Sequence, residues 1–208
     1  MLVFVRLHAN HHERMGQKFN YFREEEEMTL ALLILISMMW IPVGMLFLGA
    51  GEAKGTGFVT GVVGVLVVIG ATIHTMIGGP GFTGDPLTGG LLFVFGVLYL
   101  QVSHALLAGL TDLRSVGNGA LVVAIVCAIY AYLWATGGGV KPDGTTFVTK
   151  VPYLSFMAVT FTVLCLTVVG QAYGKISAKV PAWLLIILTF TCLLAPAIGL
   201  LAYGKLPF

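Results

Sequence analysis

The sequence predicts an all-α membrane protein built from six transmembrane helices. Of its 208 residues, 58% are hydrophobic and only 10% are charged, and the mean hydropathy is +0.97. Six apolar segments of transmembrane length follow one another along the chain. A soluble domain carries roughly 25% charged residues. So few charges cannot cover a water-soluble globule of this size, whereas hydrocarbon requires no polar cover.

The first 27 residues differ from the rest, because they are polar and contain His8, His11 and His12. They lack the apolar core of a signal peptide. We predict a polar N-terminal extension over residues 1–27 and a six-helix channel domain over residues 28–208, and we interpret Met28 as the biological start. The alternative is a disordered or interfacial tail. A histidine tract without acidic or thiol partners at fixed spacing is weak evidence for metal binding, so no metal site is predicted.

The six apolar segments each have about 20 residues, which span roughly 30 Å as a helix and match the hydrocarbon thickness. None contains Asp, Glu, Lys or Arg. The predicted spans are Thr29–Gly49, Gly57–Ile77, Thr88–Leu110, Gly117–Ala135, Val151–Tyr173 and Pro181–Tyr203.

The connections between the spans alternate in character. The first, third and fifth are short and carry Lys or Arg, whereas the second (Gly78–Leu87) and fourth (Thr136–Lys150) are longer and rich in Gly, Pro and Thr. This pattern predicts three successive helical hairpins. The distribution of Lys and Arg leaves the orientation open, since the extension favours a cytoplasmic N-terminus and its removal weakly favours the reverse.

The spans carry little chemistry. Ion-coupled pumps and proton relays use charged side chains within the membrane, and this sequence has none there, which favours an uncharged solute. We interpret His104 of the third span as a polar structural partner between helices, with a pore role as the alternative. Cys127, Cys165 and Cys192 are interpreted as small buried hydrophobic residues. No enzyme motif is present, so no catalytic residue and no cofactor are predicted.

Small residues and prolines predict how the helices meet. Gly57 and Gly61 form a small-xxx-small pair in the second span, which indicates close helix packing within the bundle or between subunits. Pro42 and Pro196 lie inside the first and sixth spans and are expected to kink them.

Four sequence motifs occur in a characteristic order. They are Phe58–Gly61 (FVTG), Thr88–Tyr99 (TGGLLFVFGVLY) with His104 five residues on, Leu164–Thr167 (LCLT), and Pro181–Leu184 (PAWL) with Pro196 thirteen residues after Trp183. Together with the six spans, they resemble the AmiS/UreI family of bacterial urea and short-chain amide channels. The resemblance runs from Met28 to the end of the chain.

This resemblance implies a passive channel for small uncharged amides in the bacterial inner membrane. Each six-helix protomer would hold its own pore, and six protomers would form a ring with both termini outside. The expected partners are the uncharged solute, the lipid bilayer and further copies of the chain, with no nucleic acid and no cofactor.

The resemblance also implies which residues line the pore. An apolar and aromatic slot suits a planar amide and excludes ions, which would lose their hydration without compensation. The alternative is that these residues form ordinary bundle core. The implied lining consists of Leu33, Ile36, Trp40, Phe93, Val97, Phe161, Cys165 and Leu188.

The sequence departs from the acid-activated urea channels of that family. Those members have tryptophans where Phe161 and Cys165 stand, an acidic residue at Leu188 and an aromatic residue at Val97. We therefore expect a wider and less polar slot that favours short aliphatic amides, with urea as a further candidate. The alternatives are an ion-coupled secondary transporter of a small metabolite and a non-transporting membrane subunit.

Overall fold

The computed structural model describes residues 30–76, 86–140, 144, 146–203 and 206–207. The predicted extension over residues 1–27, with its three histidines, lies outside the described residues, as does most of the second connection.

The described residues contain six long apolar helices, which confirms the predicted fold class. Each lies within a few residues of the predicted span. They are the first helix (Leu30–Phe47), α2 (Ala53–Met76), α3 (Pro86–Leu107), α4 (Arg114–Thr136), α5 (Pro152–Ala172) and a sixth span of α6 (Lys179–Leu188), η1 (Thr189–Leu194) and α7 (Ala195–Tyr203).

The fourth connection holds a small antiparallel ribbon of β1 (Gly138–Val140) and β2 (Thr146–Val148). The sequence had indicated only a longer connection rich in Gly, Pro and Thr there. Valine and threonine favour extended backbone, which accounts for the pairing. Gly137 ends α4 with a φ of 74°, and this left-handed turn leads the chain from the helix into β1.

Large apolar side chains cover the outside of the bundle. Phe58, Val65 and Ile69 of α2 and Ile125 and Ile129 of α4 are all exposed in the single chain. In water such a surface would drive aggregation, whereas in a bilayer it meets lipid or a neighbouring protomer.

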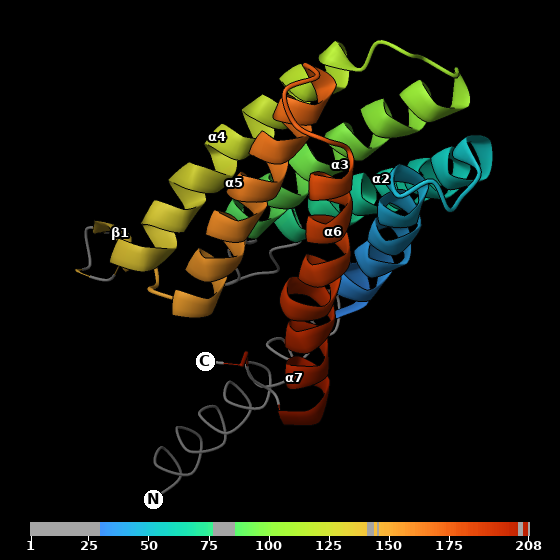
Figure 1. Cartoon of the computed structure of the whole chain (residues 1–208). Coiled ribbons are helices and arrows are strands. Elements are labelled where there is room, and N and C mark those ends of the chain that lie inside the picture. The colour runs from blue at the N-terminus through green and yellow to red at the C-terminus, as the bar shows by residue number, and fades with distance from the viewer. Residues whose placement is uncertain (1–29, 77–85, 141–143, 145, 204–205, 208) are drawn as a thin grey trace, which may run out of the picture.

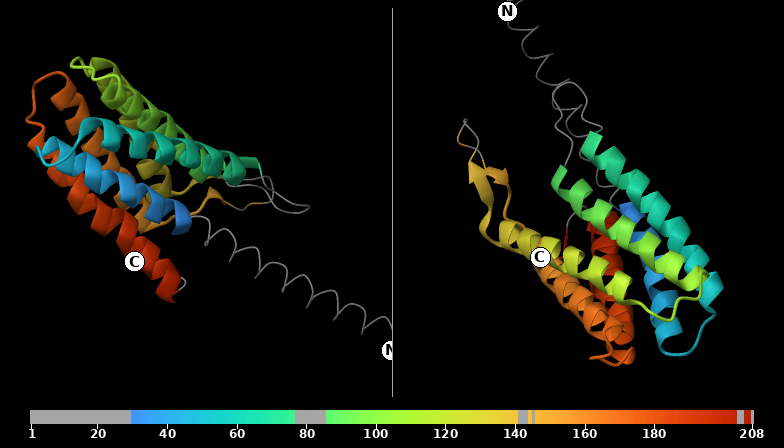
Figure 2. Two further views of the ribbon diagram at one scale, coloured as in Figure 1. Left: turned by 90° about the vertical axis from the view of Figure 1, so that its right-hand side faces the viewer. Right: turned by 90° about the horizontal axis from the view of Figure 1, so that it is seen from above.

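The chain runs as three successive hairpins, but its closest helix contacts join one hairpin to the next. Figures 1 and 2 show α2 beside α3 and α4 beside α5. The first helix packs against α6, since a Cβ added at Gly44 would lie 3.0 Å from the Ala182 carbonyl oxygen. Short connections and close packing therefore alternate around the bundle: the helices that pack most closely, α2 with α3 and α4 with α5, are joined by the longer connections.

Small residues hold α2 and α3 together. The two helices are antiparallel. Gly57 and Gly61 of α2 lie beside Ser103 of α3, and Val68, further along α2, lies beside Gly96, earlier in α3. The Ser103 hydroxyl donates to the Gly57 carbonyl oxygen at 2.7 Å. A Cβ at Gly96 would lie only 2.7 Å from the Val68 Cγ2 atom. The predicted small-xxx-small pair thus packs within the protomer, where glycine permits backbone approach.

Small residues also allow close packing between α4 and α5. A Cβ at Gly117 would meet the Ala172 Cβ atom at 2.7 Å, and the Ser155 hydroxyl donates to the Ala131 carbonyl oxygen at 2.8 Å. Ala120 and Ala124 of α4 are completely or almost completely buried. Both tight pairs therefore combine small side chains with one interhelical hydroxyl-to-carbonyl bond.

The contact between α2 and α3 predicts a sharp stability difference between adjacent positions. A Cβ at Gly64 would already lie 3.1 Å from Leu100 and 3.2 Å from the Gly96 carbonyl oxygen. We expect Gly64→Leu to destabilise the protein by about 1–3 kcal/mol, because overpacking forces the helices apart. Val65→Leu, which adds bulk to an exposed neighbour, is the matched control. Equal thermal midpoints for the two variants in detergent would contradict this close packing.

Candidate functional site

Two cavities lie in the core of the bundle, one toward each end. The larger, of about 300 Å³, adjoins the start of the first helix and the end of α2, where Leu32 and His74 line it. The smaller, of about 80 Å³, adjoins the end of the first helix and the start of α4, where Phe47 and Val116 line it. Because successive helices run in opposite directions, these linings belong to opposite faces of the membrane domain.

Both cavities are overwhelmingly apolar. The larger one receives residues from all six helices, and its polar contributors are Trp40, His74, Thr88, Tyr99 and Trp134. The smaller one has Thr60, Tyr99, Gln171 and Trp40 as its polar contributors. No Asp, Glu, Lys or Arg lines either cavity within the described residues.

Four aromatic residues, called here the aromatic junction, separate the cavities: Trp40, Phe95, Tyr99 and Phe161. The first three line both cavities. The ring centroids of Phe161 lie 5.4 Å from those of Trp40 and 5.5 Å from those of Phe95, both edge to face. This is the preferred geometry of aromatic pairs, so the junction is a packed layer and not an open hole.

One hydrogen bond crosses the aromatic junction. The Trp40 Nε1–H donates to the Tyr99 hydroxyl oxygen at 3.1 Å. The hydroxyl hydrogen of Tyr99 has no acceptor among the described residues, and Tyr99 lines both cavities. A hydroxyl both donates and accepts, so Tyr99 keeps a donor for a molecule that reaches the junction.

Most of the predicted lining residues lie at these cavities. Leu33, Ile36 and Trp40 of the first helix and Phe161 of α5 line the larger cavity, and Cys165 of α5 lines the smaller one. Leu188 is buried in the core but borders neither cavity.

The two residues predicted from the third span lie elsewhere. Phe93 and Val97 are 46% and 41% exposed on the outside of α3. Phe95 and Tyr99 occupy the cavity side instead. Two residues turn a helix through about 200°, so each predicted residue lies almost opposite the one that faces the core. His104 is exposed in the last turn of α3 and borders neither cavity.

Sequence reasoning also missed His74 as a residue of the larger cavity. His74 lies near the end of the second span, at the expected membrane boundary, where a solvated histidine is common. The structure buries His74 to 5% exposure, with an imidazole that borders the cavity. Tyr99 could have been identified as a cavity residue from the sequence, since it is a polar aromatic residue within the third-span motif.

The comparisons with known proteins agree with this architecture. The profile of the AmiS/UreI family transporters matches residues 28–203. The chain belongs to the AmiS/UreI family. As a member of this transporter family it is a membrane transport protein and not an enzyme.

Two solved structures share the fold of this AmiS/UreI protein. One is the Helicobacter pylori urea channel in its closed state, solved by cryo-EM, with 23% identity, a TM-score of 0.64, and coverage of 85% of this chain and 99% of that one. The other is a crystal structure of the H. pylori urea channel, with 20% identity, a TM-score of 0.67, and coverage of 86% and 99%. A comparison with curated protein sequences found no match.

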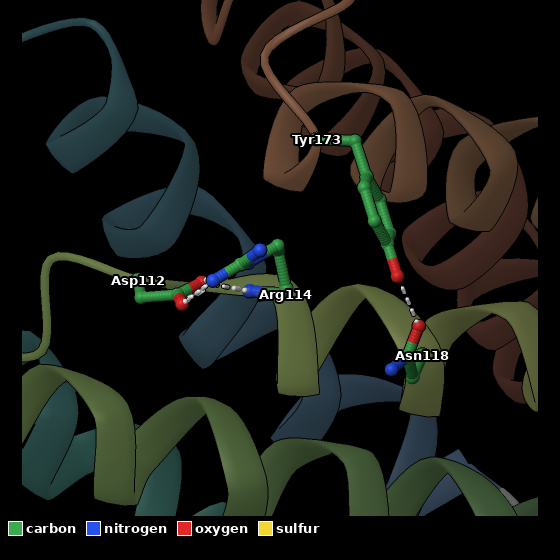
Figure 3. Close-up of polar contacts among 4 residues, drawn as sticks. All are labelled: Asp112, Arg114, Asn118 and Tyr173. Carbon is green, nitrogen blue, oxygen red and sulfur yellow. Dashed lines mark hydrogen bonds and ion pairs between the residues drawn. The ribbon is translucent and has the colours of Figure 1, made fainter.

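Two polar contacts lie near the start of α4 and the end of α5, as Figure 3 shows. The Tyr173 hydroxyl donates to the Asn118 Oδ1 atom at 2.7 Å, and the Arg114 guanidinium pairs with the Asp112 carboxylate at 2.5 Å. The Arg114 hydrogen bonds lower the pKa of Asp112 to about 2. Asp112 is therefore ionised throughout the physiological range. Because the ion pair is exposed, it organises this connection and adds little stability.

No cluster of three or more potential metal ligands occurs among the described residues. The three cysteines are free and buried, in agreement with their interpretation as small core residues. The chemistry available at the site is therefore aromatic contact and hydrogen bonding from a few neutral groups.

The junction hydrogen bond predicts a stability effect. Tyr99→Phe removes the acceptor of the buried Trp40 N–H, and we expect a loss of about 1–3 kcal/mol. Tyr132→Phe, at a residue 67% exposed on α4, removes a hydroxyl without a buried partner and serves as the control. Thermal unfolding followed by tryptophan fluorescence gives the comparison. A Tyr99→Phe midpoint equal to the control would mean that the indole finds another acceptor, such as cavity water.

Proposed function

We propose that the protein is a passive channel for small uncharged amides, through a pore that runs from the larger cavity across the aromatic junction to the smaller cavity. The observation that carries this proposal is the pair of uncharged cavities at opposite ends of the bundle, which share Trp40, Phe95 and Tyr99. Family membership and the fold shared with the H. pylori urea channel support it.

The proposed pore keeps five of the residues expected from sequence and exchanges two. The first helix and α5 contribute Leu33, Ile36, Trp40, Phe161 and Cys165. For α3 we propose Phe95 and Tyr99 in place of Phe93 and Val97, and we assign Leu188 a supporting position behind the wall.

Transit through this pore depends on shape and on one donor. A planar amide fits between aromatic rings, which contact its two faces, while the Tyr99 hydroxyl donates to its carbonyl oxygen at the junction. An ion would have to shed its hydration in an apolar passage without a compensating charge. The junction must open by side-chain rotation as the solute passes, because its rings are in contact.

We infer short aliphatic amides as the substrate class, with urea as a second candidate. A cavity of about 300 Å³ with apolar walls has room for an alkyl group as well as an amide head. Burial of each methylene is favourable by about 0.8 kcal/mol, which urea cannot gain because it has no alkyl group.

We further propose that the protein resides in the bacterial inner membrane as a ring of copies, six by the family resemblance. The exposed apolar faces of α2 and α4 are suited to lipid and to neighbouring protomers. An ion-coupled transporter and a non-transporting subunit are the competing functions. Among the described residues no charged side chain lines either cavity, which favours neither competitor.

Stopped-flow uptake into proteoliposomes tests the proposal. The full chain is reconstituted, and urea, formamide, acetamide and glycerol are compared without an ion gradient. We expect rapid, non-saturating amide influx that is faster than glycerol influx and unaffected by a protonophore. Accumulation against a gradient would indicate a coupled transporter. Rates equal to those of empty liposomes would eliminate the channel proposal.

The smaller cavity predicts a specific block. We expect Cys165→Trp to reduce amide flux by about tenfold or more, because the indole fills the cavity beside the aromatic junction. Leu166→Trp adds the same side chain at the next residue, which is 47% exposed on the outside, and should leave flux unchanged. Wild-type flux in correctly inserted Cys165→Trp protein would mean that Cys165 is core and not lining.

A further inference from the structure

The sixth span contains one turn that is wider than an α-helix. Over η1 the backbone hydrogen bonds join residues five positions apart, as in a π-helix. The Ala195 N–H, for example, donates to the Phe190 carbonyl oxygen. Before this turn the pattern is regular, since the Thr189 N–H donates to the Leu185 carbonyl oxygen. Wide turns of this kind are rare in helices and are often found at functional sites.

The wide turn leaves the Thr191 carbonyl without a main-chain donor. In a regular helix its partner would be the Ala195 N–H, which here bonds Phe190. In a continued wide turn its partner would be residue 196, and Pro196 has no N–H. An orphan carbonyl inside a membrane protein is strongly unfavourable.

A side chain from another helix supplies the missing donor. The Tyr153 hydroxyl, at the start of α5, donates to the Thr191 carbonyl oxygen at 2.5 Å. Tyr153 is only 2% exposed and borders neither cavity. A weaker contact lies beside it, with the Thr160 Oγ1 atom 3.4 Å from the Cys192 Sγ atom. The wide turn is thus fastened to α5 at two adjacent residues.

The wide turn sets which face of the sixth span meets the cavities. Leu185 lines the smaller cavity, and Leu193 lines the larger one. Eight residues of regular α-helix would place them about 80° apart around the axis. A wide turn absorbs one residue, which brings the two side chains to within about 20° of each other. It therefore allows one helix to present the same face to both cavities, with Pro196 and Leu200 continuing that wall.

We propose that Tyr153 is a positioning residue for solute selectivity: by capping the Thr191 carbonyl, it holds the wide turn that fixes Leu193, Pro196 and Leu200 as one wall of the larger cavity. This inference rests on the proposed amide channel. The wall fixed in this way limits the size of the amide that passes. Tyr153 acts through the backbone of another helix and does not itself contact the solute.

The test is the ratio of butyramide to formamide permeability in proteoliposomes of the full chain. Tyr153→Phe keeps the ring and removes the donor, so the Thr191 carbonyl can recapture the Ala195 N–H and turn the later wall residues away. We expect the ratio to rise by about threefold or more. Tyr132→Phe, an exposed tyrosine on α4, is the matched control and should keep the wild-type ratio.

A second substitution separates capping from simple packing. Pro196→Ala supplies an N–H at the position that a wide turn would use for the Thr191 carbonyl. Because Pro196 itself lines the larger cavity, the Pro196→Ala single variant is the reference. We expect Tyr153→Phe to raise the ratio much less in the Pro196→Ala background than in the wild-type background, which would not happen if Tyr153 only filled space.

The possible failures are distinguishable. If wild-type protein conducts amides but Tyr153→Phe leaves the ratio unchanged, the positioning role is refuted and the channel stands. The same role is refuted if Tyr153→Phe raises the ratio as much in the Pro196→Ala background as in the wild-type background. If the wild-type protein conducts no amide, the proposed function fails first.

Discussion

Hydrocarbon offers no hydrogen-bond partner to a backbone N–H or C=O, and much of this structure follows from that constraint. It requires helices across the whole membrane, and it governs the buried hydroxyls too: those of Ser37, Thr60 and Thr189 each donate to a carbonyl four residues earlier in their own helix. Where a helix departs from the regular pattern, as at η1, the freed carbonyl takes its donor from α5. Polar groups are therefore used sparingly and almost always within the protein.

Association between the helices in the membrane therefore depends on how closely their surfaces pack. Lipid tails are as apolar as leucine, so burial of apolar side chains does little to favour one helix pairing over another. Close backbone approach does so instead, through Gly61 and Gly96 between α2 and α3 and through Gly117 between α4 and α5. The two cavities are lined mainly by larger side chains, such as Trp40, Phe95 and Leu98. Tight glycine contacts and aromatic cavity walls are thus complementary parts of one packing scheme.

The spans could be predicted from sequence to within a few residues at each end, because length and hydropathy respond directly to bilayer thickness. Which face of each span points to the core could not be predicted from the sequence. In a soluble helix the apolar stripe marks the core, but here lipid and core are both apolar, so Phe93 and Phe95 look alike in the sequence although they lie on opposite sides of α3. The wide turn could not be predicted from the sequence either. Pro196 predicts an irregular helix, but it does not predict a wide turn over Thr189–Leu194 or the hydrogen bond from Tyr153.

The wide turn has a consequence for comparing this chain with its relatives. It amounts to a single inserted residue that the helix has retained within its span. Two homologues of equal function could differ there by one residue and still match in three dimensions on both sides. A gapless alignment through the sixth span would then pair every later residue with the wrong neighbour, by about 100° around the helix. Residue equivalences in this family are therefore best assigned separately before Thr189 and after Leu194.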